Sequence, residues 1–168
     1  MLSYARLNSE VRPFAPVNLH DVAEEVIHLL DAAIVERGAR VTANALPEIH
    51  GDRTQLVQLL LNLIGNGIKY CRDRSPFVHI SATRGEREWV ISVADNGIGI
   101  EEKHHDKVFE VFKRLHTQKE YSGTGIGLSV CRRVVERHGG KIWITSVVGE
   151  GSTFKFSIPH TSPESSRT

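Results

Sequence analysis

A stripe of polar side chains follows one face of a predicted amphipathic helix. Gln58, Asn62, Asn66 and Lys69 succeed one another at steps of four, four and three residues, beside an apolar stripe. Asparagine is a mediocre helix former, so its choice here needs another reason. Its neutral side-chain oxygen suits Mg²⁺, a lysine one turn on suits phosphate, and Tyr70 could lie against a base. An ordinary solvated face is the alternative for each residue alone.

A second feature is the loop sequence "DNGIGI" at 95–100, directly after a predicted strand. Gly97 and Gly99 remove side chains from this loop, which lets a planar ring approach the backbone. The Asp95 carboxylate would accept a hydrogen bond from the exocyclic amine of adenine and repel the guanine carbonyl; such a charge-assisted bond is typically worth about 1.5–3 kcal/mol. A simple Asp-Asn-Gly turn is the alternative.

Two further glycine-rich stretches follow. "SGTGIGL" (122–128) places glycines at 123, 125 and 127 just before a predicted helix, whose N-terminal N–H groups and dipole form an anion site. Its spacing is neither GxGxxG nor GxxxxGK[ST], so it is not a Rossmann or Walker phosphate loop. "GEGSTF" (149–154) leads into a strand, where Thr153 could bind a ligand directly or through water.

The elements that must position these residues are read from periodicity. The first predicted helix is capped by Asn18 and stopped by Gly38, and the second begins at Asp52. The predicted helices cover 20–37, residues from 52 onward and 127–140, with a short helical piece near 106–115; the predicted strands cover 14–19, 40–46, 77–83, 88–94, 141–146 and 152–159. The pattern predicts an α+β fold with helices on one face of a largely antiparallel sheet.

Composition narrows the function classes. The chain has 168 residues, 40% of them apolar and 24% charged, which suits one globular domain with a full core. A net charge of +1 gives no strong attraction to nucleic acid or anionic membranes. No membrane span or signal peptide is apparent, and Cys71 and Cys131 show no CxxC spacing, so we expect a cytoplasmic protein with reduced thiols. The histidines show no metal-binding arrangement.

Taken in order, the asparagine-bearing helix, "DNGIGI", "VFEVFKRLH", "GTGIGL" and "GEGSTF" resemble the boxes of the ATP-binding catalytic domain of sensor histidine kinases. The likeness is greatest to phytochrome-type kinases, whose phenylalanine box runs into a segment similar to "RLH" at 114–116. The resemblance covers residues 14–159. It implies a two-layer α/β sandwich of the Bergerat type, with a mixed, mostly antiparallel sheet of about five strands packed on three helices.

The resemblance also implies roles for individual residues. Asn66 would coordinate Mg²⁺, with Asn62 and Lys69 beside the phosphates as the other catalytic residues. Tyr70 would pack against the adenine, and Asp95 would accept a hydrogen bond from the adenine amine. The remaining implied ATP-binding residues are Gly97, Gly99, Ile100, Phe112, Ser122, Gly123, Thr124, Gly125, Gly127, Leu128 and Thr153.

A lid over the triphosphate is implied for residues 98–124, and its polar composition predicts disorder without nucleotide. Phe109 and Phe112 would anchor it, although a plain core role suits both equally well. Gly67 departs from the family, which usually has alanine there. That departure predicts a cost of about 0.5–1 kcal/mol in helix stability and a looser site.

Asn62 separates kinase from ATPase. Related gyrase, mismatch-repair and chaperone ATPases carry a glutamate four residues before the Mg²⁺ asparagine, as a base for water. An amide takes up no proton at neutral pH, so phosphoryl transfer to a histidine is favoured over hydrolysis. A stand-alone ATPase and a nucleotide-sensing or docking module without chemistry are the alternatives.

The phosphoacceptor is expected outside this chain. His20 precedes an aspartate but sits at a predicted helix start, and residues 1–12 resemble the end of a dimerisation hairpin or a linker. Residues 13–159 would form the catalytic domain and 160–168 a disordered tail. The implied partners are ATP, a dimerisation and histidine-phosphotransfer domain and a response regulator receiver domain, within a homodimeric parent; this chain alone would be monomeric and would not bind nucleic acid.

Overall fold

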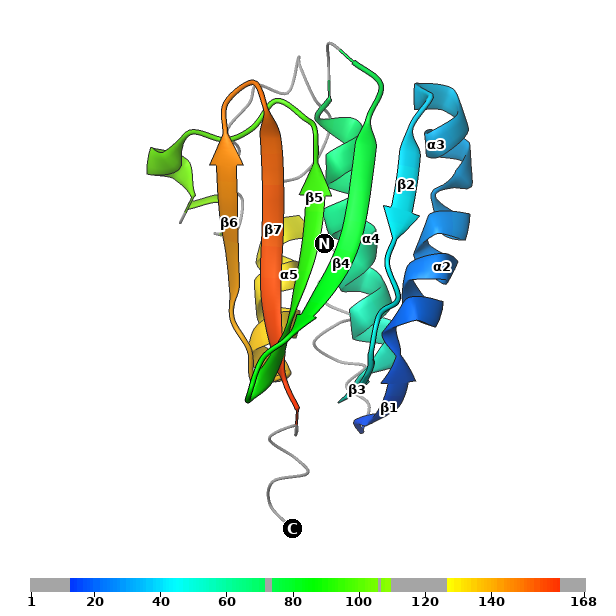
Figure 1. The fold of residues 1–168 in the computed structure, drawn as a ribbon, viewed down its shortest axis with the longest axis vertical. Coiled ribbons are helices and arrows are strands. Elements are labelled where there is room, and N and C mark those ends of the chain that lie inside the picture. Colours follow the sequence, from blue (N-terminus) through cyan, green and yellow to red (C-terminus); the bar gives the residue numbers. More distant parts are fainter. Residues whose placement is uncertain (1–12, 72–73, 106, 110–126, 161–168) are drawn as a thin grey trace.

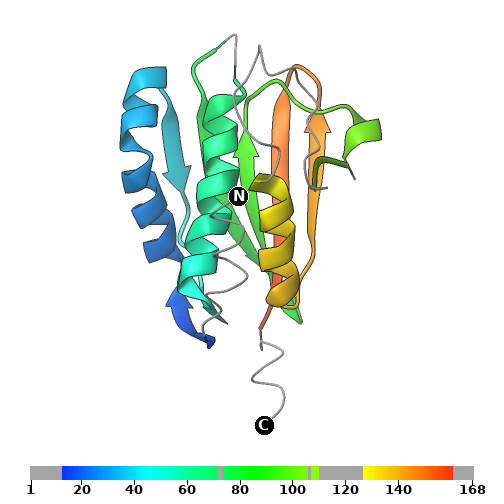
Figure 2. The same cartoon turned by 180° about the vertical axis from the view of Figure 1, so that it is seen from behind.

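The computed structural model describes residues 13–71, 74–105, 107–109 and 127–160. They form two layers, a sheet and a set of helices that covers one of its faces (Figures 1 and 2). No helix of these described residues lies on the opposite face of the sheet in either view. The predicted helical segment at 106–115, most of the lid, the N-terminal twelve residues and the tail beyond His160 lie largely or wholly outside the described ranges.

The main sheet has five strands in the spatial order β2-β4-β5-β7-β6. Their bounds are β2 Arg40–Ala43, β4 Phe77–Arg84, β5 Glu88–Asp95, β6 Ile142–Val147 and β7 Gly151–Pro159. β2 is parallel to β4 and every other neighbouring pair is antiparallel. This mixed, mostly antiparallel five-stranded sheet confirms the predicted fold class.

The helix layer consists of α2 (Leu19–Leu29), α3 (Asp31–Arg37), α4 (Arg53–Lys69) and α5 (Gly127–Arg137). α4 lies between α2 and α5 (Figure 2), and most of its apolar side is buried, whereas Val57 and Leu61 are only partly buried. The core forms where this side meets the inward-facing residues of the sheet, among them Ile80, Ile91 and Phe156. No helix of the described ranges is long and apolar enough to cross a membrane.

The first predicted helix is divided in two. Its cap and stop are confirmed, because the Asn18 side chain accepts from the N–H groups of His20 and Asp21, and Gly38 adopts a left-handed φ of 61°. However, the backbone leaves helical geometry at Leu30, with ψ at 7°. No proline or glycine marks this break. α3, the second piece, has no fully buried residue and contacts the core only through the partly buried Ile34, so core packing gives little support for continuing the line of α2.

A two-stranded sheet was only half predicted. β1 (Ala15–Asn18) was expected as an edge strand, and it pairs antiparallel with β3 (Glu48–Gly51), which was missed. β3 has only four residues between a proline and the α4 cap, and it exists because β1 supplies its hydrogen-bonding partner.

A buried polar cluster closes the helix layer beside β3. Asp52 caps α4 by accepting from the Gln55 N–H, and its other oxygen lies 2.9 Å from Nη1 of Arg137 at the end of α5. Nε2 of His138 accepts from the Asp52 N–H, while its Nδ1 lies 2.7 Å from the Val134 carbonyl oxygen. This cluster joins the start of α4 to the end of α5, whereas the predicted site lies where α4 ends and α5 starts.

Candidate functional site

The predicted polar stripe lies along α4, where its side chains are half-buried, and Asn62 within it links two helices. The Asn62 side chain accepts from Nε2 of Gln58 at 3.1 Å and donates from Nδ2 to the carbonyl oxygen of Gly127 at 3.1 Å. Both groups of the Asn62 amide are therefore engaged. The structure shows Asn62 holding the first turn of α5 against α4, a role that sequence analysis did not foresee.

Asn66 lies one turn further along the same stripe. Its half-buried side chain makes no hydrogen bond with any residue that the structure describes, so its oxygen is available to a ligand. Lys69 follows at the end of the helix, with Nζ 5.4 Å from the centre of the Tyr70 ring. The amide, ammonium and aromatic groups therefore gather at the C-terminal end of α4.

Asp95 is the last residue of β5 and lies against the same end of α4. Its Oδ1 accepts from the Gly97 N–H at 2.9 Å and from the Ser152 N–H at 3.2 Å. Oδ2 has no partner among the described residues. Burial raises the pKa of Asp95 above the ordinary value, and the two N–H groups partly oppose that shift. The result is a fixed carboxylate with one oxygen free to accept a hydrogen bond.

Gly67 explains how helix and carboxylate come together. A Cβ atom at Gly67 would lie 2.8 Å from Cγ2 of Val78 on β4 and 3.1 Å from Cβ of Asp95. The missing side chain therefore lets α4 approach β4 and β5 closely. The expectation of a looser site is wrong in this respect, because the glycine packs tightly beside Asn66 and Asp95.

The loop 96–100 is held by backbone contacts that its glycines permit. Gly97 lies so close to the Tyr70 carbonyl that a Cβ would stand 2.6 Å from that oxygen. Gly99 has φ 77°, and its Cβ would stand 2.3 Å from the Val147 carbonyl oxygen. The Ile98 N–H donates to the Tyr70 carbonyl at 3.0 Å. The two glycines thus join the end of α4 to the β6–β7 turn.

Thr153 requires a correction. Side chains alternate along β7, and Phe154 and Phe156 face the helices, so Thr153 belongs to the opposite face of the sheet. Its neighbour Ser152 is buried and sits opposite Asp95 in the strand register. The structure therefore places Ser152 beside Asp95, whereas Thr153, which was predicted to bind a ligand directly or through water, lies on the opposite face of the sheet.

The far side of the site is only partly described. Gly127 begins α5, and Leu128 is half-buried against the core. Phe109, in the short 3-10 helix η2 (Lys107–Phe109), packs edge-to-face on Phe154 with ring centres 6.1 Å apart, a contact that suits both the lid anchor and the plain core role predicted for it. The other predicted lid and phosphate residues, Phe112, Ser122, Gly123, Thr124 and Gly125, lie outside the described residues.

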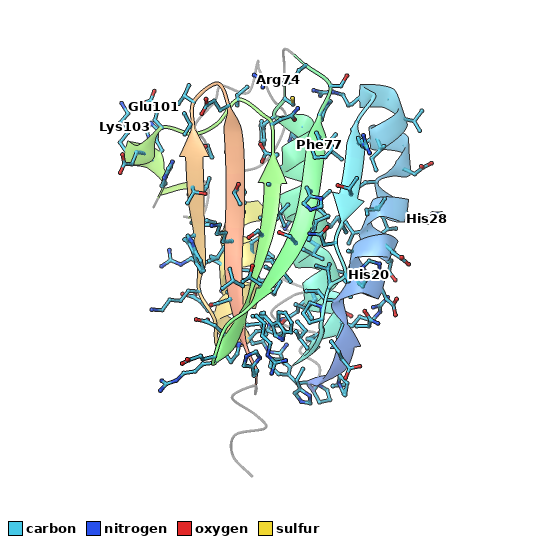
Figure 3. The ribbon with its side chains drawn as sticks, viewed as in Figure 1. His20, His28, Arg74, Phe77, Glu101 and Lys103 are labelled. Carbon is cyan, nitrogen blue, oxygen red and sulfur yellow. The ribbon has the colours of Figure 1, made fainter. Side chains whose placement is uncertain are left out.

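Asn96 and Arg74 support the loop and were missed. The Asn96 side chain accepts from the Phe77 N–H at 2.8 Å and donates to the Ser75 carbonyl at 3.1 Å. Arg74 donates to the Gly149 carbonyl at 2.8 Å, and Figure 3 shows Arg74 and Phe77 at the end of the sheet where this loop lies. The sequence signal was the asparagine next to Asp95, which was interpreted as turn chemistry.

Several side chains discussed at the sequence level lie elsewhere. His20 lies on α2, away from this end of the sheet in Figure 3, and its Nε2 lies 3.3 Å from Glu24. Both cysteines are free and buried, with Cys71 following α4 and Cys131 within α5. Among the described residues, no group of three or more His, Cys, Asp or Glu side chains could hold a metal ion.

Comparison with known proteins identifies the family. Residues 51–162 match the family described as "Histidine kinase-, DNA gyrase B-, and HSP90-like ATPase". The chain is 42% identical to cyanobacterial phytochrome A of Nostoc sp. over 95% of its own length and 21% of that protein. It is 44% identical to the adaptive-response sensory kinase SasA of Prochlorococcus marinus over 84% of its length and 38% of that protein. The chain thus spans about a fifth of the phytochrome relative.

Solved structures of histidine kinases have the same fold as this chain. The catalytic domain of histidine kinase ThkA superposes with a TM-score of 0.75 at 31% identity, covering 89% of this chain and 97% of that one. ThkA in complex with the response regulator protein TrrA superposes with a TM-score of 0.72 at 29% identity, covering 88% of this chain and 42% of that one. The resemblance predicted from the boxes is confirmed. The chain belongs to the family of histidine kinase-, DNA gyrase B- and HSP90-like ATPases, as a catalytic ATP-binding domain of the sensor histidine kinase type.

Proposed function

We propose that this chain binds Mg·ATP between the end of α4, the loop 96–100 and the start of α5, and transfers the γ-phosphoryl group to a histidine on a dimerisation domain outside this chain. One observation carries the proposal. Asp95 lies against α4 at Gly67, the residue after Asn66, with one carboxylate oxygen held by two N–H groups and the other oxygen without a partner among the described residues. An immobilised acceptor next to glycine backbone suits the adenine amine.

The residues present fit the metal as well as the base. Asn66 offers a neutral oxygen with no competing partner among the described residues, and Mg²⁺ ordinarily takes few protein ligands beside water and phosphate oxygens. Mg²⁺ would neutralise charge on the phosphates when bound. Lys69 would bind a phosphate oxygen, and Tyr70 would pack against adenine. Gly97, Gly99 and Ile100 would shape the base site, with Gly127 and Leu128 at the phosphate side.

Phosphoryl transfer is favoured over hydrolysis by Asn62. A water-activating base would have to accept a proton, which an amide does not do at neutral pH. In addition, both ends of the Asn62 amide already bond to Gln58 and Gly127. The attacking nucleophile is therefore supplied by another domain.

The partners follow from this role. The phosphoryl group would pass from ATP to a dimerisation and histidine-phosphotransfer domain and then to a response regulator, the class of protein with which ThkA has been solved. The parent would be a homodimer and this chain a monomer. Because ATP and response regulators are cytoplasmic, the domain would act in the cytoplasm.

Nucleotide titration tests the binding half of the proposal. Asn66→Ala and Asp95→Asn should each abolish measurable Mg·ATP binding by calorimetry. Asn44→Ala and Glu88→Gln are matched controls, because Asn44 is exposed after β2 and Glu88 begins β5 at its other end. Unchanged affinity in both site variants would overturn the proposal.

Phosphotransfer tests the chemical half. The chain is mixed with a dimerisation and phosphoacceptor domain of a related sensor kinase and γ-labelled ATP, and acid-labile phosphohistidine is measured. We expect label on the acceptor, lost with Asn66→Ala. Multiple-turnover phosphate release without the acceptor would favour an ATPase, and tight binding without either product would favour a nucleotide-sensing module.

A further inference from the structure

Three neighbouring strands place a row of polar residues at one level of the sheet. In the strand register, Asp95 of β5 pairs with Ser152 of β7, and Ser152 pairs in turn with Ser146 of β6. β5, β7 and β6 lie side by side in Figure 1. Ser152 is buried and Ser146 is half-buried. Ser146 lies outside every motif that the sequence analysis used.

The Ser146 hydroxyl uses all of its hydrogen-bonding capacity. It donates to the Gly151 carbonyl oxygen at 2.9 Å and accepts from the Ile100 N–H at 2.7 Å. Its oxygen also lies 2.8 Å from Oγ of Ser152. A hydroxyl has one hydrogen and two acceptor positions. Since the hydrogen of Ser146 goes to Gly151, the Ser152 hydroxyl must be the donor between the two serines.

This assignment fixes the polarity of Ser152. With its only hydrogen directed at Ser146, Oγ of Ser152 presents lone pairs alone to its remaining surroundings. The Ser152 N–H meanwhile holds Oδ1 of Asp95, whose Oδ2 has no partner in the described part of the chain. The polar atoms that remain for a ligand here, Oγ of Ser152 and Oδ2 of Asp95, are therefore both hydrogen-bond acceptors. An amine donor is favoured next to them, and a carbonyl oxygen is disfavoured.

We propose that Ser146 is a positioning residue that sets base specificity. Because its oxygen accepts the Ser152 hydrogen, Oγ of Ser152 can only accept hydrogen bonds from other groups. Ser146 also bonds the Ile100 N–H and so holds the loop against β6. Both effects make the site prefer the adenine amine over the guanine carbonyl. The inference rests on the proposed function, because it assigns a specificity determinant to the same nucleotide site. It predicts that removal of a hydroxyl that contacts no nucleotide changes the choice between ATP and GTP.

The test compares affinities for Mg·ATP and Mg·GTP by displacement of a fluorescent ATP analogue. Ser146→Ala frees the Ser152 hydroxyl to rotate and donate, so the ratio of ATP to GTP affinity should fall about tenfold, as expected for one lost hydrogen bond and one relieved repulsion. Ser146→Thr keeps the hydroxyl and should retain the wild-type ratio. Thr145→Ala, at the exposed neighbouring position on the opposite face, is the matched control.

A double variant separates positioning from simple stability. Ser152→Ala should lower the ratio by itself, and Ser146→Ala combined with Ser152→Ala should lower it no further, because Ser146 acts through Ser152. A Ser146→Ala variant with a lower melting temperature and the wild-type ratio would overturn the proposal, as would full additivity of the two substitutions. If Ser146→Ala does not fold, an unchanged ratio in Ser152→Ala overturns it. Wild-type protein that binds neither nucleotide would instead refute the proposed function itself.

Discussion

Two glycines in α4 offer a sensitive test of how the helix packs on the sheet. Gly65 and Gly67 are two residues apart in the same helix, but their surroundings differ. A Cβ at Gly65 would meet one atom of Leu30 at 4.0 Å, an ordinary contact, whereas a Cβ at Gly67 would stand 2.8 Å from Cγ2 of Val78. Val78 is fully buried and β-branched, so it has little freedom to move aside.

The expected effects of alanine substitution have opposite signs. Alanine has a higher helix propensity than glycine by about 0.8–1.0 kcal/mol per residue. Gly65→Ala should therefore raise the free energy of unfolding by up to that amount. Gly67→Ala gains a similar amount but adds an overpacking cost of about 1–3 kcal/mol. The propensity contributions nearly cancel between the two variants. Their difference in unfolding free energy should therefore be about 1–3 kcal/mol, or some 2–12 °C in melting temperature at about 2–4 °C per kcal/mol.

Urea unfolding followed by circular dichroism measures the difference. Val78→Ala removes the clashing methyl group, so Gly67→Ala should cost less in that background than in the wild type. Because the new methyl group would also press on Asp95, Gly67→Ala should weaken Mg·ATP binding while Gly65→Ala leaves it unchanged. Equal stabilisation by both alanines would refute the close approach of α4 to β4.

Two other variants test buried charges. Burial raises the pKa of Asp95, so the folded chain holds its proton more readily than the unfolded chain does, and stability is lost as the pH rises through the folded-state pKa. Asp95→Asn should therefore raise the melting temperature at pH 8 and raise it less at pH 5; a gain independent of pH would contradict this cause. Arg137→Ala removes the ion pair to the buried carboxylate of Asp52 and should cost about 3–5 kcal/mol in urea unfolding. Arg132→Ala, which breaks only an exposed ion pair, should cost at most about 1 kcal/mol, and equal losses would contradict the buried network.

Sequence patterns predicted much of the fold correctly because the helix ends and the hairpin are determined by interactions between residues close together in the chain. The cap at Asn18 and the stop at Gly38 depend on hydrogen bonds and backbone angles within a few residues, and both are confirmed. The hairpin of β4 and β5 is marked by alternation around a glycine turn. β3 was missed because a four-residue strand has too little pattern of its own and owes its form to β1.

The site was predicted less evenly than the fold. The stripe on α4 follows from helical periodicity, and the place of Asp95 at the end of a strand follows from the alternating pattern of β5 and the loop sequence after it. Thr153 was predicted as a ligand-binding residue, and Ser152, its hydroxyl-bearing neighbour, was not considered. A shift of one residue along a strand reverses the face, and only the pairing with β5 shows which serine or threonine meets Asp95.

By itself, the sequence determined the order of elements, the identity of the asparagine, aspartate and glycine groups, and membership in the kinase-type ATPase family. These depend on residue type and spacing along one chain. Only the tertiary structure decided which groups are already engaged: Asn62 with Gly127 across 65 positions, and Asp95 with Ser152 across 57. Hydrogen bonds between distant segments are set by how α4, α5 and the sheet pack together, and no local pattern records that geometry.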